Sequence, residues 1–496
     1  MKNLFSKTKL LLLGLLLQGG IASAQQFITL DKAMEIAMEH SPSIRTSLLA
    51  LERSQQLLKA QKAALKSQFT LSLTPVEYSK NRTFDDYTST WYTNESFASY
   101  GTFTVAQPVL LTDGTISLVN QFGWQNSNST ASGIENKVFT NTLNLAIDQP
   151  LFTYNKLKLE LKTLELDLEN SNLSYAMAKL NLEKQVSQYF YNVYLAQMSL
   201  SIAQDELKNT KATYEITKNK VDAGLSAMEE LYQAELNYAT SQSDVQNQQV
   251  SLDNAKDIFK QYIGMDIFEE IMVMTDVNVN PVEIDSKKAI EYGLSSRMEI
   301  RQREIDVESS QFDLITTKAE NEFKGDVALS IGLIGENEKL NNIFETPTRN
   351  PRVSVAFNVP LFDWGEKKAR IKAQEAVIQS TQLDLEEEKK QIIIDIRSVC
   401  RTLDNDRMQI DIAKQNERNA QLTYEINEER YKNGDLTGMD LSLYQTQLSE
   451  QKMAYAQALI DYKIELLNLK VQSLYDFEKQ EPIVPQEIID ASKQKK

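Results

Sequence analysis

The chain carries the same series of features twice, and this duplication constrains its fold more than any other property. Three pairs of segments recur about 210 residues apart and a fourth about 256 residues apart, which is too long for a solenoid unit. The pairs are Gln149-Pro150-Leu151-Phe152 with Val359-Pro360-Leu361-Phe362, Tyr214-Glu215-Ile216 with Tyr424-Glu425-Ile426, Gly224 with Gly434, and Ile44-Arg45 with Ile300-Arg301. We therefore expect two similar halves, each running helix, strands, very long helix, tight turn, helix.

Residues 1–24 have the pattern of a secretory signal peptide. Lys2, Lys7 and Lys9 form a basic start, an apolar run covers residues 10–17, and the small residues Ala22-Ser23-Ala24 form a cleavage site. The apolar run is too short for a membrane-spanning helix. The mature protein is thus expected in the periplasm, in the bacterial outer membrane or outside the cell.

Charge and residue types exclude several classes of function. The net charge is −16 before cleavage and about −19 once the three leader lysines are removed, which argues against nucleic-acid binding and against docking on an anionic membrane. Cys400 is the single cysteine and His40 the single histidine, so an internal disulfide or a zinc site is not expected. Both residues are interpreted as structural. The sequence contains no compact cluster of polar residues that would indicate an enzyme, and no cofactor is expected.

Two proline-free stretches predict long helical hairpins. Neither 151–280 nor 361–481 contains proline, so helices can run without interruption. In the first copy, apolar residues recur every seven positions, at Val186, Val193, Leu200, Leu207, Tyr214 and Val221. The second copy keeps this register at Ile396, Leu403, Ile410, Tyr424 and Tyr431, and Glu417 interrupts it. This spacing is typical of a coiled-coil seam. Helices of about 65 residues would be about 100 Å long.

Glycine-centred segments are expected to reverse these helices. Gly224 lies in the first reversal and Gly434 in the second, each beside the small or polar residues that favour a helix stop. Leu231-Tyr232-Gln233 matches Leu443-Tyr444-Gln445 at an offset of about 212, so the second turn is predicted to be two residues longer.

Between the helices, apolar residues alternate with polar ones as in strands. Such alternation occurs near 69–73, 143–147, 327–333 and 353–359. It fits a transmembrane barrel wall, and it equally fits a soluble antiparallel sheet with one dry face. The first half has about 46 more residues here than the second, and these contain a predicted hairpin around Asp113-Gly114.

The predicted organisation follows from these patterns. A signal peptide at 1–24 precedes a first repeat at 25–280, with strands at about 68–148 and a helical hairpin at about 151–263. A second repeat at 281–477 has strands at about 326–359 and a hairpin at about 361–477, before a tail at 478–496. The mixed segments 264–300 and 478–496 are expected to form a small layer around the middle of the helices.

Together these features resemble the TolC family of outer-membrane efflux proteins. The resemblance covers nearly the whole mature chain. It depends on Leu30-Asp31-Lys32-Ala33, Ser41-Pro42-Ser43-Ile44, the two Pro-Leu-Phe transitions, the second continuing as Asp363-Trp364-Gly365, and the two glycine reversals. It implies a mainly α fold with a β-barrel: a homotrimer whose long hairpins form a periplasmic tunnel and whose copies each give four strands to a 12-stranded barrel in outer-membrane lipid.

The resemblance also implies a function and its partners. The chain would be the passive exit duct of a tripartite efflux or type I secretion system, working with a periplasmic adaptor and an inner-membrane transporter. No nucleotide-binding P-loop is present in the sequence, so the transporter would supply the energy. The extra hairpin of the first half departs from the family pattern of four strands.

The family resemblance marks candidate residues at the tunnel entrance. Glu230 and Tyr431 match the positions of a latch, and Asp440 matches a pore-facing aspartate, whereas Leu443 and Leu436 replace a second aspartate and a latch arginine. Arg430 is a candidate substitute for that arginine. The turns expected to bind the adaptor contain Gly224, Leu225, Ser226, Gly434, Asp435 and Leu436.

Alternatives to these roles follow from the same residues. Asp440 also suits a solvated position at a helix start. A periplasmic coiled-coil adaptor or scaffold without a pore would explain the seven-residue repeats, but not the strands that end at Pro150 and Pro360. The sequence does not indicate the exported substrate, which the transporter would select.

Overall fold

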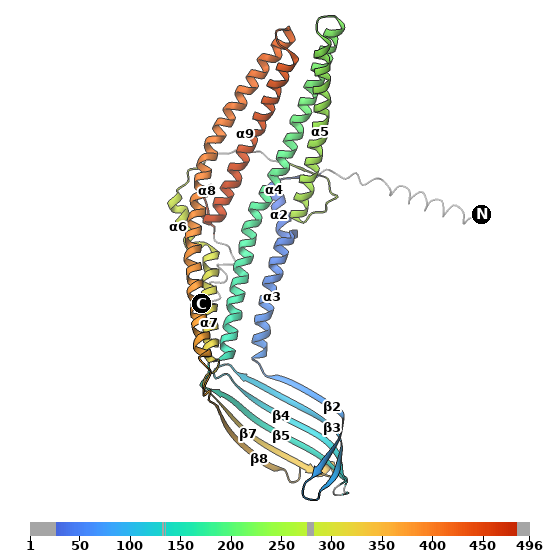
Figure 1. The fold of residues 1–496 in the computed structure, drawn as a ribbon, viewed down its shortest axis with the longest axis vertical. Helices are drawn as coiled ribbons and strands as arrows, with labels where there is room; N and C mark the ends of the chain where they lie inside the picture. The colour runs from blue at the N-terminus through green and yellow to red at the C-terminus, as the bar shows by residue number, and fades with distance from the viewer. Residues whose placement is uncertain (1–25, 131–132, 134, 275–281, 484–496) are drawn as a thin grey trace, which may run out of the picture. The chain divides into compact units, whose positions relative to one another are not determined.

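The structure, a computed structural model, describes residues 26–130, 133, 135–274 and 282–483 (Figure 1). The predicted signal peptide at 1–24 lies outside these residues, as does most of the predicted tail at 478–496. None of the described helices combines the length and the apolar character that crossing a membrane requires.

Each half of the chain contains two shorter helices, a group of strands and a long helical hairpin. The helices are α2 (Leu30–His40), α3 (Pro42–Ala64), α4 (Lys156–Asp222), α5 (Met228–Ile263), α6 (Ser286–Ser296), α7 (Met298–Ala319), α8 (Glu366–Asn433) and α9 (Gly438–Ser473). The main strands are β2 (Gln68–Asp85), β3 (Thr90–Val109), β4 (Gly114–Ser129), β5 (Glu135–Leu151), β7 (Lys324–Asn337) and β8 (Thr348–Asn358). The order of helix, strands and helical hairpin is the predicted one in both halves, except that two short helices precede the strands where one was expected.

The chain divides into two compact units. The first consists of Met1–Leu49, Asn172–Ile300 and Glu388–Lys496, and its described part holds both helical turns. The second consists of Ala50–Ser171 and Arg301–Glu387, and it holds the six main strands.

The long helices and their buried seam are as predicted. α4 has 67 residues and α8 has 68, so each rises about 100 Å along its axis at 1.5 Å per residue. In the first unit, the repeated positions Val186, Val193, Ile396 and Leu403 are almost fully buried. Val186 and Val193 belong to a core that also contains Phe259 of α5. Burial of this one stripe holds each hairpin together.

The two helix reversals have the same geometry. Gly224 and Gly434 have φ of 74° and 85°, and the residue after each donates a backbone hydrogen bond back into the helix, to Lys220 (2.8 Å) and Arg430 (2.9 Å) respectively. Glycine suits this position because it adopts positive φ without steric cost.

The prediction of a longer second turn is wrong. The next helix is capped at Ala227, three residues after Gly224, and at Thr437, three residues after Gly434, so the second turn is not the longer one. The Leu231 and Leu443 segments that suggested the difference lie inside α5 and α9, where a two-residue shift leaves the turn unchanged.

In the second unit, one antiparallel sheet contains strands from both halves. Its order is β2-β3-β4-β5-β7-β8, so β2 and β8 are the edges. The predicted hairpin at Asp113-Gly114 is confirmed, because β3 and β4 pair from Asn94–Ser129 to Val109–Gly114. The four strands that the family pattern implied are corrected to six, since the first half supplies two hairpins instead of one.

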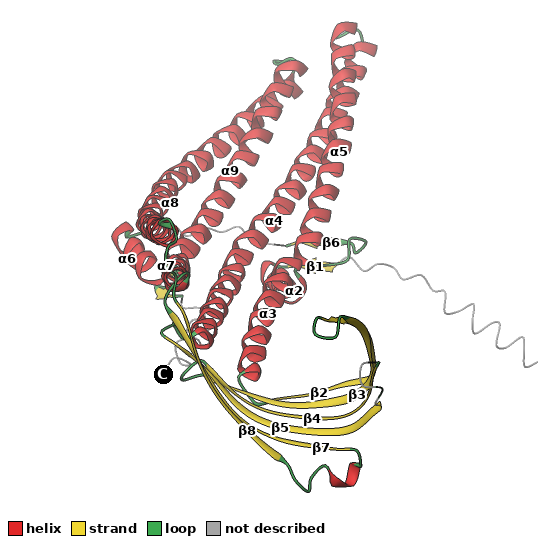
Figure 2. Ribbon diagram, turned by 60° about the horizontal axis from the view of Figure 1, so that its bottom comes forward, coloured by secondary structure: helices red, strands yellow, loops and turns green. Residues whose placement is uncertain are grey.

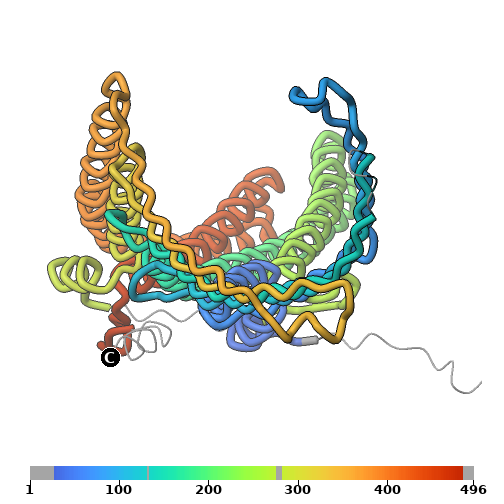
Figure 3. Tube along the Cα trace, turned by 90° about the horizontal axis from the view of Figure 1, so that it is seen from below, coloured from blue at the N-terminus to red at the C-terminus, as the bar shows by residue number. Residues whose placement is uncertain are grey.

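The sheet is curved and has one apolar and one polar face. Figures 2 and 3 show the strands side by side in an arc whose two ends do not meet. Large apolar side chains alternate along the strands on one face and are exposed, among them Leu71 (65%), Leu145 (44%), Ile331 (52%) and Val353 (73%). Such a face needs lipid or protein to cover it.

The two residues interpreted as structural lie in the first unit. Cys400 is buried, and this burial raises the pKa of its thiol to about 11. His40 ends α2, and its carbonyl group lies against Gly264, the positive-φ cap of α5 (φ 78°). A methyl group at Gly264 would overlap the carbonyl oxygen of His40.

This contact gives a stability prediction. Gly264→Ala should destabilise the protein by at least about 2–4 kcal/mol, because it adds left-handed strain and a clash with backbone. Gly224→Ala is the matched control: its φ is also positive, but open space surrounds it, so it should lose only about 1 kcal/mol. Thermal unfolding of the detergent-extracted variants, followed by circular dichroism, measures both. Equal losses would contradict the packing of α2 on α5.

Candidate functional site

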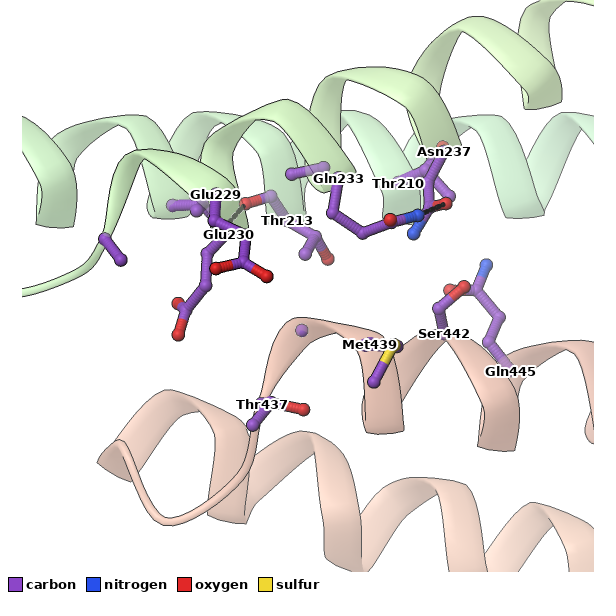
Figure 4. Close-up of a pocket in the computed structure, with 14 residues that line it drawn as sticks. Thr210, Thr213, Glu229, Glu230, Gln233, Asn237, Thr437, Met439, Ser442 and Gln445 are labelled. Atoms are coloured by element: carbon purple, nitrogen blue, oxygen red, sulfur yellow. Dashed lines mark hydrogen bonds between the residues drawn. The ribbon is translucent and has the colours of Figure 1, made fainter.

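A polar cavity of about 310 Å³ lies beside the two helix reversals (Figure 4). α4, α5 and α9 form its walls. Its polar lining includes Thr210, Thr213, Thr217, Glu230, Gln233 and Thr437. Figure 4 shows Glu229 and Glu230 on the side of α5 that faces the start of α9. The cavity therefore separates the tip of one helical hairpin from the tip of the other.

Tyr431 joins the two hairpins beside this cavity. It is only 4% exposed, and its hydroxyl group hydrogen-bonds the hydroxyl of Thr217 on α4 at 3.1 Å. The Lys220 ammonium group lies 4.7 Å from the centre of the Tyr431 ring, within the range of a cation–π contact. The hydroxyl and the ring of Tyr431 thus both bind α4.

The environment of Tyr431 keeps its phenol neutral. Burial raises the pKa of Tyr431 above its ordinary value, and the negative charge of Glu230 raises it further, while the Thr217 hydrogen bond acts in the opposite direction. Because the folded protein disfavours the phenolate, stability is lost only at alkaline pH, above the ordinary phenol pKa of about 10. The contact between the hairpins is therefore insensitive to pH near neutrality.

Glu230 and Asp440 occupy equivalent positions, each three residues after a helix cap. Glu230 follows the Ala227 cap and accepts a hydrogen bond from Ser226. Asp440 follows the Thr437 cap, accepts a 2.7 Å hydrogen bond from the Thr437 hydroxyl, and donates its own backbone N–H to that oxygen. Both carboxylates stabilise the start of a helix, where the helix dipole favours negative charge.

The other candidate residues lie around the same turns. Arg430 donates to the side chain of Asn427 one turn earlier on α8. Leu443 is 65% exposed on α9, and Leu225 is 80% exposed in the first turn. Leu436 is partly buried in the second turn, whereas Gly224, Gly434 and Asp435 are exposed and Ser226 is partly buried. The structure thus brings Tyr431 and Glu230 together and places the turn residues at the hairpin tips.

Sequence reasoning missed the partners of Tyr431 on α4. Thr210, Thr213 and Thr217 lie on one face of α4 at spacings of three and four residues. Thr217 contacts Tyr431, and Thr210 hydrogen-bonds Ser241 of α5 at 2.7 Å. A polar stripe inside an otherwise apolar seam was the available signal, because such hydroxyl groups need partners when they are buried.

Solved structures share this fold at low sequence identity. The CmeC outer membrane channel of Campylobacter jejuni is 14% identical, with a TM-score of 0.70, over 94% of this chain and 89% of that one. The MtrE outer membrane channel of Neisseria gonorrhoeae is 16% identical, with a TM-score of 0.64, over 90% and 89%. The outer membrane protein VceC of Vibrio cholerae is 15% identical, with a TM-score of 0.63, over 90% and 95%. No curated protein sequence matches the chain.

A match to one family model identifies the family of this chain. The model of the outer membrane efflux proteins matches residues 115–264 and 294–471, which together are more than half of the chain and include both helical hairpins. This is a family of channels and not of enzymes, and no comparison favours an adaptor without a pore. The chain belongs to the outer membrane efflux protein family, and its place is the outer membrane.

Proposed function

We propose that three copies of this chain form a passive exit duct, which an adaptor and an inner-membrane transporter load and open from the periplasm. The single observation that carries this proposal is the curved sheet with an exposed apolar face and two unpaired edges. In lipid, unpaired backbone groups at a sheet edge cost several kcal/mol each. Neighbouring copies that complete the edges would remove this cost.

The helical hairpins also support assembly. Met228, Tyr232 and Leu236 are 50%, 63% and 59% exposed and recur every four residues along α5, so they form an apolar stripe. Met439 and Leu443, 64% and 65% exposed, form a shorter stripe on α9. Stripes of this kind are buried when helices pack side by side, as in a closed tube of hairpins.

The entrance is proposed to lie at the helix reversals. The Tyr431–Thr217 hydrogen bond ties the α8–α9 hairpin to the α4–α5 hairpin, and it would favour the closed arrangement. Glu230 lines the adjacent cavity and would contribute to the closed arrangement through the effect of its negative charge on Tyr431. The adaptor would bind the exposed turns with Gly224, Leu225 and Ser226, and with Gly434, Asp435 and Leu436. Binding there would spread the hairpins, which is a rearrangement of packed helices between two states.

Asp440 is proposed to face the lumen of the assembled duct. One aspartate in each of three copies would form a ring of carboxylates, which attracts cations into a narrow passage. Its hydrogen bond to Thr437 is compatible with this role, since a carboxylate has further lone pairs to offer.

The latch gives the experiment that tests gating. Tyr431→Phe removes one hydrogen bond of about 1 kcal/mol per copy while keeping the buried ring. In planar bilayers the purified channel should then conduct more and stay closed for less of the time. Tyr424→Phe, on the same helix, is the control and should leave conductance unchanged. Equal behaviour of the two variants would remove Tyr431 from the gate.

The carboxylate ring gives a second test. Asp440→Ala and Asp440→Asn should both reduce the preference for cations and weaken block by divalent cations, because both remove the charge. Asp440→Asn keeps an acceptor for the Thr437 cap, so it separates charge from helix stability. Asp435→Ala, in the exposed turn, is the control. Unchanged ion selectivity in Asp440→Asn would leave Asp440 with its capping role alone.

A further inference from the structure

The first half of the chain contains two strand hairpins that end in the same way. Gln107-Pro108 directly precedes Val109, the last residue of β3, and Gln149-Pro150 directly precedes Leu151, the last residue of β5. The match to the efflux-protein family begins at residue 115, so β4 and β5 are inside it and the β2–β3 hairpin lies before it. The two hairpins of the first half are thus β4–β5, here called the family hairpin, and β2–β3, here called the additional hairpin because the match does not reach it.

The repeated glutamines make equivalent hydrogen bonds. The side-chain amide of Gln107 donates to the carbonyl oxygens of Leu65 (3.0 Å) and Pro108 (2.7 Å). That of Gln149 donates to the carbonyl oxygens of Thr112 (2.7 Å) and Pro150 (2.8 Å). Leu65 lies just before β2, and Thr112 lies just before β4, so one acceptor of each amide precedes the first strand of the same hairpin. Each amide thus closes the base of its own hairpin, where the chain enters and leaves the sheet.

The turn between β3 and β4 is fixed to the start of α4. The side-chain amide of Asn155 donates to the carbonyl oxygens of Leu110 (2.7 Å) and Leu111 (3.2 Å). The carboxylate of Asp113 accepts the backbone N–H of Leu157 at 2.8 Å, which caps the helix. Because α4 begins where β5 ends, the additional hairpin reaches the same end of the sheet as the family strands.

One row of the apolar face continues across the additional hairpin without a break. The strand register places Phe69 of β2 beside Val105 of β3, Val105 beside Leu118 of β4, Leu118 beside Leu145 of β5, and Leu145 beside Ile331 of β7. Phe69, Leu118, Leu145 and Ile331 are 68%, 38%, 44% and 52% exposed. One apolar row thus runs from the additional hairpin through the family strands, as expected where all of them face lipid.

We propose that all six strands form the barrel wall and that β8 of each copy pairs with β2 of a second copy of this chain. Six strands alternate in direction, so the two edges run opposite ways and can pair as antiparallel neighbours. Three copies then close a barrel of eighteen strands, instead of the twelve that the family pattern implies. This inference rests on the proposed trimeric duct.

Strand number sets the width of the exit. Barrel diameter grows roughly linearly with the number of strands, and barrels of 16–18 strands enclose an aqueous channel. The outer-membrane segment of this duct is therefore about half as wide again as a twelve-stranded one. Cargo size is then limited at the helical entrance and not at the exit.

Cysteine cross-linking tests which strand lies at the edge. In a Cys400→Ala background, Ser72→Cys in β2 is combined in turn with Arg352→Cys, Ser354→Cys and Ala356→Cys in β8, which alternate on the polar face. At least one pair should give a covalent trimer on non-reducing gels. The matched control replaces the β2 cysteine by Ser117→Cys in β4, which is internal in the six-stranded wall and should give no cross-link.

The outcomes separate this inference from the proposed function. Cross-links from Ser117→Cys to β8, with none from Ser72→Cys, would place β4 at the edge and overturn the eighteen-stranded wall while leaving the trimer. Chains that run as monomers in detergent would overturn the proposed duct itself. Electron cryomicroscopy of the wild-type protein, viewed along the threefold axis, gives an independent count, and twelve strands there would contradict the proposal.

Discussion

The unpaired backbone at the two edges of the sheet is the constraint on which the rest of the molecule depends. β2 and β8 each present a row of N–H and C=O groups on one side, and the face between them exposes apolar side chains. A single copy cannot satisfy both demands, because its curved sheet does not close. Assembly with further copies in lipid would satisfy both at once, which is why the proposed duct needs more than one copy.

The second constraint is the packing within and between the helical hairpins. Residues such as Val193 and Leu403 are buried in the apolar seams of the hairpins, whereas the contact between the hairpins at their tips is polar. Apolar seams are costly to open, while one hydrogen bond contributes about 1 kcal/mol. This difference supports the proposal that the hairpins move as rigid pieces and that a partner protein breaks the Tyr431–Thr217 contact.

Much of the architecture could be predicted from the sequence because it is periodic or local. The seven-residue spacing identifies buried positions such as Ile396, and Gly224 and Gly434 stand where only positive φ reverses a helix. The pairing of Tyr431 with Thr217 could not be predicted, since the residues are far apart in sequence and no local pattern links them. The six-stranded sheet was only partly foreseen: the hairpin at Asp113 was visible in the alternation, but the family pattern favoured four strands.

The measurement that tests the central claim most directly is electron cryomicroscopy of the detergent-extracted mature protein. We expect a particle with threefold symmetry, in which a helical tube on the order of 100 Å long extends from a detergent belt that surrounds the strands. A compact or filamentous particle without a detergent belt, or a stable monomer, would contradict it. Such a result would return the chain to the class of periplasmic scaffolds without a pore.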